Sequence, residues 1–199
     1  MKPTRREWLR LTAAALVAPD LRAADPVQTD VCVYGGSAAG VAAAIQAARM
    51  GRTVALVDDG RHPGSMSVEG LGGSGINNHD FRNDVAIRGL AREFYPRIGR
   101  TYGSQEPVYL FEPNVAEQVV EEWLAEAGIR VFRDHRLAEG TGAVEKDPAT
   151  QRIRGIRAEN GARFRARVFL DGTIEGDLIA AAGVETIIGR ESAAKCRTM

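Results

Sequence analysis

The sequence has few cysteines and no long apolar run. Cys32 and Cys196 are the two cysteines among 199 residues, and they lie too far apart to form a C-x-x-C motif. A disulfide framework and a zinc site are therefore not indicated, and we expect Cys32 to pack as a small apolar side chain. No apolar stretch reaches the ~18 residues that a membrane-spanning helix needs, which predicts no stable membrane insertion.

The chain also has no excess of charge of either sign. Its 26 basic residues balance its 26 acidic residues, and because the first 24 positions are rich in arginine, the remainder is mildly acidic. A mildly acidic domain of this kind has no basic patch for nucleic acid. Hydrophobic residues make up 44% of the chain and aromatic residues 6%, which is typical of one globular domain and excludes a disordered or collagen-like chain.

Residues 1–24 have the layout of a signal peptide. A basic start is followed by a weakly apolar middle, a Pro-Asp break and small residues near Ala24, where a signal peptidase would cut. The basic part resembles the twin-arginine export signal, in which a pair such as Arg5 and Arg6 precedes a large apolar residue and another base. The resemblance implies a transient partner, the twin-arginine export machinery, and a periplasmic or exported location. An uncleaved amphipathic surface helix is the alternative.

Residues 30–58 predict a βαβ unit. A short apolar strand leads into a glycine turn, an alanine-rich helix that ends at Gly51, and a second apolar strand that ends at Asp58. Gly35 permits a tight turn out of the first strand, and Gly40 lets the helix pack close to the sheet. The pattern predicts dinucleotide binding, with a purely structural turn as the alternative.

Individual residues of this unit have expected roles in binding. Ala38 and Ala39 leave the helix N-terminus uncluttered, so that backbone N–H groups can hold a pyrophosphate. Ser37 replaces the middle glycine of G-x-G-x-x-G, and its hydroxyl can donate a hydrogen bond that compensates for the narrower approach. We expect Asp58 to be an exposed carboxylate that accepts hydrogen bonds from an adenosine ribose, with Asp59 as the next candidate.

A second loop of small residues favours FAD over NAD. Gly64, Ser65 and Met66 follow the second strand, where flavoproteins place a loop against the pyrophosphate and ribityl chain. A glycine-rich stretch over residues 70–78 comes next and is interpreted as a functional loop or a plain linker. An NAD-dependent dehydrogenase and a non-catalytic dinucleotide-binding module remain the alternatives.

The turn and several later segments resemble the FAD-dependent oxidoreductase family, whose members begin with V-Y-G-G-[ST]-x-A-G. Residues 33–40 match this turn, including Gly36, and make Ser37 the family's own variant. The other matching segments are residues 89–95, 111–116, 171–178, 182–184 and 189–192. This chain departs from the family at Ser65, where a second glycine is usual, and at Gly75, where an aspartate is common.

The resemblance implies FAD as cofactor and an exported oxidoreductase whose flavin accepts a hydride from a small organic substrate. It implies further cofactor contacts from the backbone of Leu137 at the adenine edge and from Gly172 and Thr173. Residues 25–199 are then the FAD-binding domain. We expect this domain to be incomplete at the C-terminus, before the family's later strand and substrate domain, and the sequence indicates no catalytic acid or base.

The chain as a whole predicts an α/β, Rossmann-like FAD-binding fold with a central parallel sheet and an antiparallel β-meander crossover. We expect helices over residues 83–97 and 113–127 and a strand over residues 129–132. The second helix has an apolar i, i+4 stripe that is typical of core packing. Turn signals predict the meander over residues 137–167, and the apolar run 168–170 predicts a buried parallel strand.

The three histidines do not indicate a metal site. His62, His79 and His135 share no metal-ligand spacing. His62 precedes the Gly64 loop, near the position where some flavoproteins attach FAD covalently through histidine. A surface loop histidine is the alternative.

Overall fold

The computed structural model describes residues 25–70, 87–186 and 189. The predicted signal segment 1–24, most of the glycine-rich stretch and Gly75 lie outside these residues. Within them, no helix is long and apolar enough to cross a membrane.

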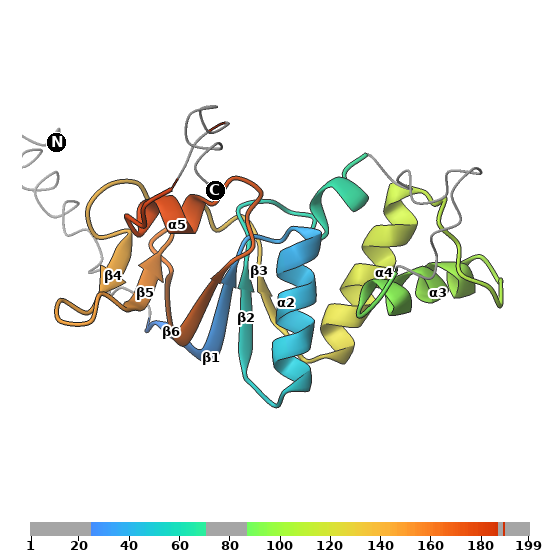
Figure 1. The fold of residues 1–199 in the computed structure, drawn as a ribbon, viewed down its shortest axis with the longest axis horizontal. Helices are drawn as coiled ribbons and strands as arrows, with labels where there is room; N and C mark the ends of the chain where they lie inside the picture. The colour runs from blue at the N-terminus through green and yellow to red at the C-terminus, as the bar shows by residue number, and fades with distance from the viewer. Residues whose placement is uncertain (1–24, 71–86, 187–188, 190–199) are drawn as a thin grey trace, which may run out of the picture.

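A six-stranded sheet with the strand order β3-β2-β1-β6-β5-β4 forms the centre of the molecule (Figure 1). Four neighbouring strands are parallel, namely β3 (Arg130–Phe132), β2 (Val54–Val57), β1 (Val27–Tyr34) and β6 (Arg163–Asp171). The two antiparallel strands are β5 (Ile153–Arg157) and β4 (Val144–Lys146). The predicted α/β fold with a parallel sheet and an antiparallel meander is therefore confirmed.

The helices are α2 (Ala38–Arg49), α3 (Ala91–Thr101), α4 (Pro113–Glu126) and α5 (Asp177–Ala181), with a short 3₁₀ helix, η2, at Ser65–Ser67. Residues 83–86 of the helix expected over residues 83–97 lie outside the described residues, and within the described part α3 begins at Ala91 and continues to Thr101. Gly89 explains the later start, because its φ of +58° is left-handed and cannot belong to a right-handed helix. Pro96 is accommodated inside α3.

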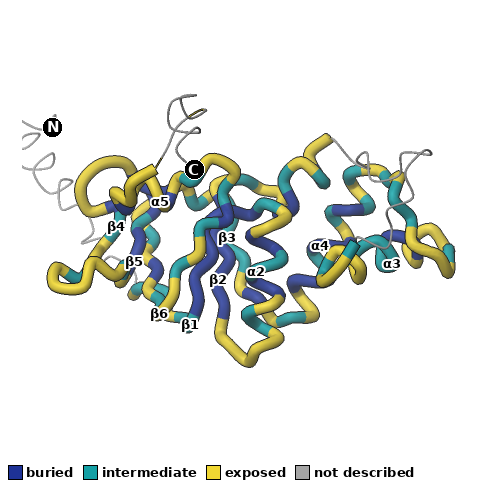
Figure 2. Tube along the Cα trace, in the orientation of Figure 1, coloured by how far each residue is buried: buried dark blue, intermediate teal, exposed yellow. Residues whose placement is uncertain are grey.

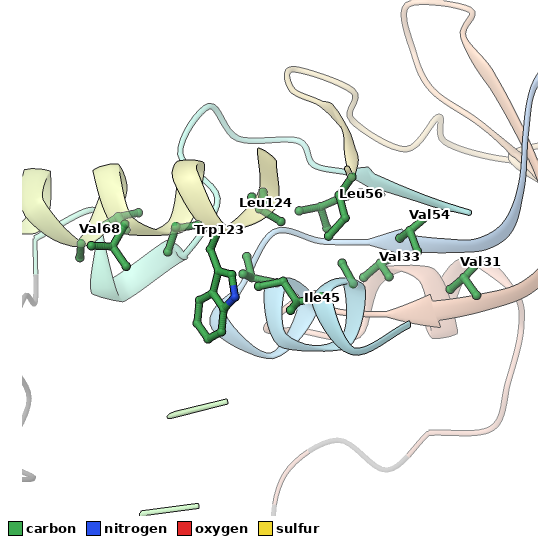
Figure 3. Close-up of a cluster of buried hydrophobic side chains, with 14 of the residues drawn as sticks. Val31, Val33, Ile45, Val54, Leu56, Val68, Trp123 and Leu124 are labelled. Atoms are coloured by element: carbon green, nitrogen blue, oxygen red, sulfur yellow. The ribbon is translucent and has the colours of Figure 1, made fainter. Parts of the chain in front are cut away.

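Helix α4 confirms the predicted apolar stripe. It buries Ala116, Val119, Val120, Trp123 and Leu124, and Gly128 follows its end with a φ of +66°. Figure 3 shows Trp123 and Leu124 beside Ile45 of α2 and the strand residues Val33 and Leu56, in one hydrophobic cluster. The helices thus cover one face of the sheet.

The opposite face of the sheet has its own buried cluster. Cys32 and Tyr34 of β1 pack there with Phe164 of β6, the segment around Leu137, and Leu178 of α5. Cys32 is fully buried, and burial raises the pKa of its thiol to about 12, which confirms that it packs as an apolar residue. Strand β2 and the second half of β1, residues 31–34, are buried throughout, which Figure 2 shows in dark blue.

Strand β6 is parallel to β1, as predicted, but it is not buried. Val168 is 47% exposed and Leu170 is 36% exposed. The register places both residues beside Val31 and Val33, on the face that α2 covers over β1, and within the described residues no helix extends that cover over them. The prediction of a parallel strand at residues 168–170 is therefore confirmed, and the prediction that this strand is buried is wrong.

Candidate functional site

The parallel register brings two turns together at the carboxyl edge of the sheet. Tyr34, the last residue of β1, pairs with Asp171, the last residue of β6, and the N–H of Gly172 donates to the carbonyl of Tyr34 at 2.7 Å. The β1–α2 turn and the β6–α5 turn consequently lie side by side. Ligands of open α/β sheets bind at this edge.

Three glycines form the contact between these turns. Gly35 has a φ of +103°, and a Cβ on it would lie 2.3 Å from the backbone nitrogen of Thr173. A Cβ on Gly40 would lie 2.0 Å from the carbonyl oxygen of Gly35, and one on Gly172 would lie 2.7 Å from the Cα of Gly40. Side chains have no room here, so the helix and both turns depend on glycine at these positions.

Ser37 uses its hydroxyl inside the protein. The hydroxyl donates to the carbonyl of Gly172 at 2.5 Å and accepts from the N–H of Gly40 at 3.3 Å, which makes Ser37 the N-cap of α2. The expected donation to a phosphate is therefore not what this hydroxyl does in the structure. Its role is to tie the helix start to the β6 turn.

The start of α2 leaves donors free for an anion. The N–H groups of Ser37, Ala38 and Ala39 have no acceptor within the described structure, and the first turn of the helix has no acidic side chain. Ala38 and Ala39 are both exposed. Exposed donors at the positive end of a twelve-residue helix suit a diphosphate.

Asp58 is buried, contrary to the expectation of an exposed carboxylate. It is only 7% exposed, and its Oδ1 accepts from the N–H of Gly36 at 2.8 Å. A Cβ on Gly36 would lie 2.3 Å from Oδ2 of Asp58, which explains the glycine there. The carboxylate thus holds the turn as well as facing the cavity, whereas Asp59 is exposed.

The β6–α5 turn is organised by the carboxylate of Asp171. Its oxygens accept from the N–H and hydroxyl of Thr173, at 2.9 and 2.6 Å, and from the N–H of Ile179 at 2.8 Å. The Thr173 hydroxyl in turn accepts from the N–H groups of Gly176 and Asp177. Thr173 is thereby fixed at the wall of the cavity.

A cavity of about 280 Å³ lies between these turns, and a larger one of about 710 Å³ adjoins it. Asp59 and Asp177 line both cavities and lie where the two cavities meet. Burial and the nearby Asp171 raise the pKa of Asp177. The predicted residues that line the smaller cavity are Gly35, Gly36, Ser37, Asp58, Asp59, Ser65 and Thr173.

The second loop is attached to the first. The N–H of Gly64 donates to the carbonyl of Gly36 at 2.6 Å, and Ser65 lines the cavity with a left-handed φ of +50°. That φ explains why a glycine is usual at this position in the family. Met66 differs from the prediction in its setting, since it is 56% exposed and does not line the cavity.

Leu137 lines the larger cavity, but its N–H is already bonded. It donates to the hydroxyl oxygen of Tyr34 at 2.7 Å, across the sheet from β1. Burial is the main reason that the pKa of Tyr34 is raised to about 12, so the phenol keeps its proton. The Leu137 N–H is therefore not free for a ligand, whereas the Tyr34 hydroxyl still has a proton to donate.

Sequence reasoning did not assign several residues that line the cavities. Glu69, Glu175 and Asp177 add carboxylates to the smaller cavity, and Tyr34 lines the larger one. The signal for three of them was available, because Tyr34, Glu175 and Asp177 belong to segments that match the family. Glu69 belongs to none of these segments.

Fold and site together define a dinucleotide-binding protein of the Rossmann type, with a glycine turn at a helix N-terminus and a carboxylate at the end of the second strand. Residues 30–199 match the family described as FAD dependent oxidoreductase. The chain belongs to this family, and FAD is its cofactor, as predicted. The free N–H groups of the turn and the close glycine contacts fit a diphosphate that approaches the backbone.

Solved structures show the same fold at low identity. L-proline dehydrogenase from P. horikoshii has a TM-score of 0.59 at 15% identity, over 82% of this chain and 58% of that chain. The geranylgeranyl bacteriochlorophyll reductase-like protein from Thermoplasma acidophilum has a TM-score of 0.53 at 19% identity, over 82% and 44%. THI4 from Thermovibrio ammonificans has a TM-score of 0.51 at 15% identity, over 96% and 76%. No curated protein matches.

Proposed function

We propose that this chain is the FAD-binding portion of an exported oxidoreductase whose flavin accepts a hydride from a small organic substrate. The observation that supports this most directly is the convergence of the Gly35 turn, Asp58 and Thr173 on one cavity at the carboxyl edge of the parallel sheet. When bound, FAD supplies an isoalloxazine ring that takes up the hydride. The chain spans 58% of L-proline dehydrogenase, so the reaction of the whole protein belongs to this proposal.

Each part of the site has a role in holding the cofactor. The N–H groups of Ser37, Ala38 and Ala39 bind the diphosphate at the N-terminus of α2. Asp58 accepts from the ribose hydroxyls through the oxygen that Gly36 does not use. A carboxylate there also repels the 2′-phosphate of NADP, which favours FAD.

The identity of the flavin tests the proposal. The full chain is purified, its visible spectrum is recorded, and the cofactor is released by heat and identified by chromatography. We expect flavin absorbance and FAD. Arg154→Gln, on the distant meander, is the matched control and retains the flavin. Recovery of FMN alone, or a colourless protein that binds NAD, would contradict the proposal.

Export is a separate part of the proposal, supported by the order of the basic, apolar and small-residue segments in residues 1–24. Replacing both Arg5 and Arg6 by lysine keeps the charge but removes the paired guanidinium groups, so the precursor remains in the cytoplasm with its cofactor bound. Arg22→Lys, outside the pair, is the control. An unchanged periplasmic yield of the double variant would rule out this pathway.

A further inference from the structure

The smaller cavity has many carboxylates and one basic side chain. Of its described lining residues, Asp58, Asp59, Glu69, Glu175 and Asp177 are acidic, and His62 is basic. No lysine or arginine is among them. A cofactor diphosphate brings two more negative charges into this cavity, and such an anion is bound most strongly by charged donors.

His62 is held in place from two directions. Its ring Nδ1 lies 2.5 Å from Oε1 of Glu117 on α4. Two residues further along the chain, Gly64 is bonded to the carbonyl of Gly36 in the phosphate turn. The imidazole, whose side chain is 48% exposed, therefore lies at the wall of the cavity, where Glu117 of α4 orients it.

The charge of His62 depends on this pairing. The hydrogen bond to Glu117 raises the pKa of the imidazole above its ordinary value, and Glu69 adds a smaller effect in the same direction. Arg61 has the opposite effect, and its own guanidinium is bonded to Asp134. The other carboxylates that line the same cavity are Asp58, Asp59, Glu175 and Asp177.

We propose that His62 is a cofactor-binding residue: as an imidazolium it binds the diphosphate of FAD, and Glu117 is the positioning residue that keeps it charged and oriented. This inference rests on the proposed binding of FAD at the Gly35 turn. It differs from covalent attachment, one of the two sequence-based interpretations of His62, by making the contact reversible and electrostatic. The other interpretation, a surface loop position, agrees with the 48% exposure of the side chain. Because the cation must be present, FAD affinity falls as pH rises through the pKa of His62.

The test measures the dissociation constant of FAD, by quenching of flavin fluorescence, from about pH 6 to about pH 9, the interval in which a histidine with a raised pKa loses its proton. Both phosphates of FAD stay ionised throughout, so a change in affinity reports on the protein. We expect wild-type affinity to fall about tenfold or more across the interval, in line with the loss of one charged hydrogen bond. His62→Gln binds more weakly at low pH and shows no such dependence.

Two further variants and two further ligands make the test specific. Glu117→Gln keeps His62 but moves the fall in affinity to lower pH, whereas Arg154→Gln, on the distant meander, keeps the wild-type fall. ADP-ribose, which has the diphosphate, follows the same pattern as FAD, and adenosine, which has none, binds wild type and His62→Gln alike. Melting without ligand shows that each variant is folded.

The outcomes separate this inference from the proposed function. If wild type binds no FAD at any pH, the proposed function fails. If wild type binds FAD but His62→Gln binds it equally well at low pH, or if affinity does not change with pH, the inference is wrong and FAD binding stands. Flavin that stays with wild type but not with His62→Gln after acid precipitation would likewise overturn it, since His62 would then hold FAD covalently.

Discussion

Asp58 shows how one side chain serves both the fold and the cofactor. One carboxylate oxygen accepts from the Gly36 N–H inside the turn, and the other side of the group faces the cavity. A buried N–H without an acceptor costs free energy, so removal of this carboxylate affects the protein even without FAD. Asp59, next along the chain, is exposed and makes a natural comparison.

Substitutions at Asp58 are expected to separate these two roles. Asp58→Ala lowers the free energy of unfolding of the apo protein by about 1–3 kcal/mol and weakens FAD binding roughly 10- to 100-fold. Asp58→Asn keeps an oxygen for the Gly36 N–H, so it loses affinity with a smaller loss of stability. Urea unfolding and FAD titration measure the two effects, with Asp59→Ala as the comparison for stability and Asp25→Ala, which lines neither cavity, as the control for binding. An Asp58→Ala variant as stable as wild type would show that the Gly36 bond contributes nothing.

Ser65 is a residue whose backbone conformation suits glycine better. Its φ of +50° is left-handed, which costs a residue with a Cβ about 1 kcal/mol. Relief of this strain alone would raise the melting temperature of the apo protein by about 2–4 °C. The greater entropy of glycine in the unfolded chain offsets part of this gain, so we expect Ser65→Gly to give a smaller increase. Ser67→Gly, at a position in the same 3₁₀ helix without positive φ, is the control and lowers the melting temperature. The opposite order of the two variants would contradict this account.

Among the elements, the contact between α2 and the β6–α5 turn depends on glycine from both sides. The Cα atoms and carbonyls of Gly35, Gly40 and Gly172 approach so closely that an added Cβ would lie under 3.0 Å from backbone. Ser37 strengthens the contact with its bond to the Gly172 carbonyl. The turn that holds the diphosphate is therefore shaped by a strand that follows it by more than a hundred residues in the sequence.

Gly40→Ala and Gly172→Ala close this contact from opposite sides. Each is expected to lower the free energy of unfolding by about 1–3 kcal/mol, because backbone must move to admit the methyl group. The double variant should lose less than the sum of the two, since the first displacement makes room for the second. Urea unfolding of the four proteins measures the coupling, and Gln46→Ala on the exposed face of α2 is the control. Strict additivity would mean that the two glycines do not share one contact.

For the whole molecule, exposed ion pairs predict a loss of stability in acid. Hydrogen bonds from arginine side chains lower the pKa values of Glu93, Glu126 and Asp147 below their ordinary range. A carboxylate with a lowered pKa in the folded state stabilises the protein above its unfolded-state pKa, and this contribution is lost as pH falls. Glu93 and Glu126 are exposed and Asp147 is partly exposed, so salt weakens the effect.

We therefore expect the urea midpoint to be highest near neutral pH and to fall as pH drops below about 5, with a smaller fall at high salt. Asp147→Asn should reduce this dependence, because Arg154 then has no charged partner there. Asp25→Asn, a carboxylate that makes none of the described ion pairs, is the control. A midpoint that is independent of pH in both wild type and Asp147→Asn would exclude these carboxylates as its source.

The sequence by itself determined the local elements and the type of ligand. Glycine, apolar periodicity and a terminal carboxylate are patterns over neighbouring residues, so they predicted the βαβ unit, the stripe of α4 and the phosphate turn. Register in the parallel sheet was beyond such patterns. The register places Gly172 against Gly40 and leaves Val168 exposed. In this arrangement the Ser37 hydroxyl donates to the carbonyl of Gly172, and the Leu137 N–H donates to the hydroxyl oxygen of Tyr34.

Only the tertiary structure decided how the site is charged and held. Asp58 bonds a backbone N–H 22 positions earlier in the chain, and His62 pairs with Glu117, 55 positions later. The identity of an acidic residue or a histidine in the sequence does not tell whether its side chain is buried, paired or free. Its protonation and its reach depend on which distant elements pack against it, because charge is stabilised by neighbours in space and not by neighbours in sequence.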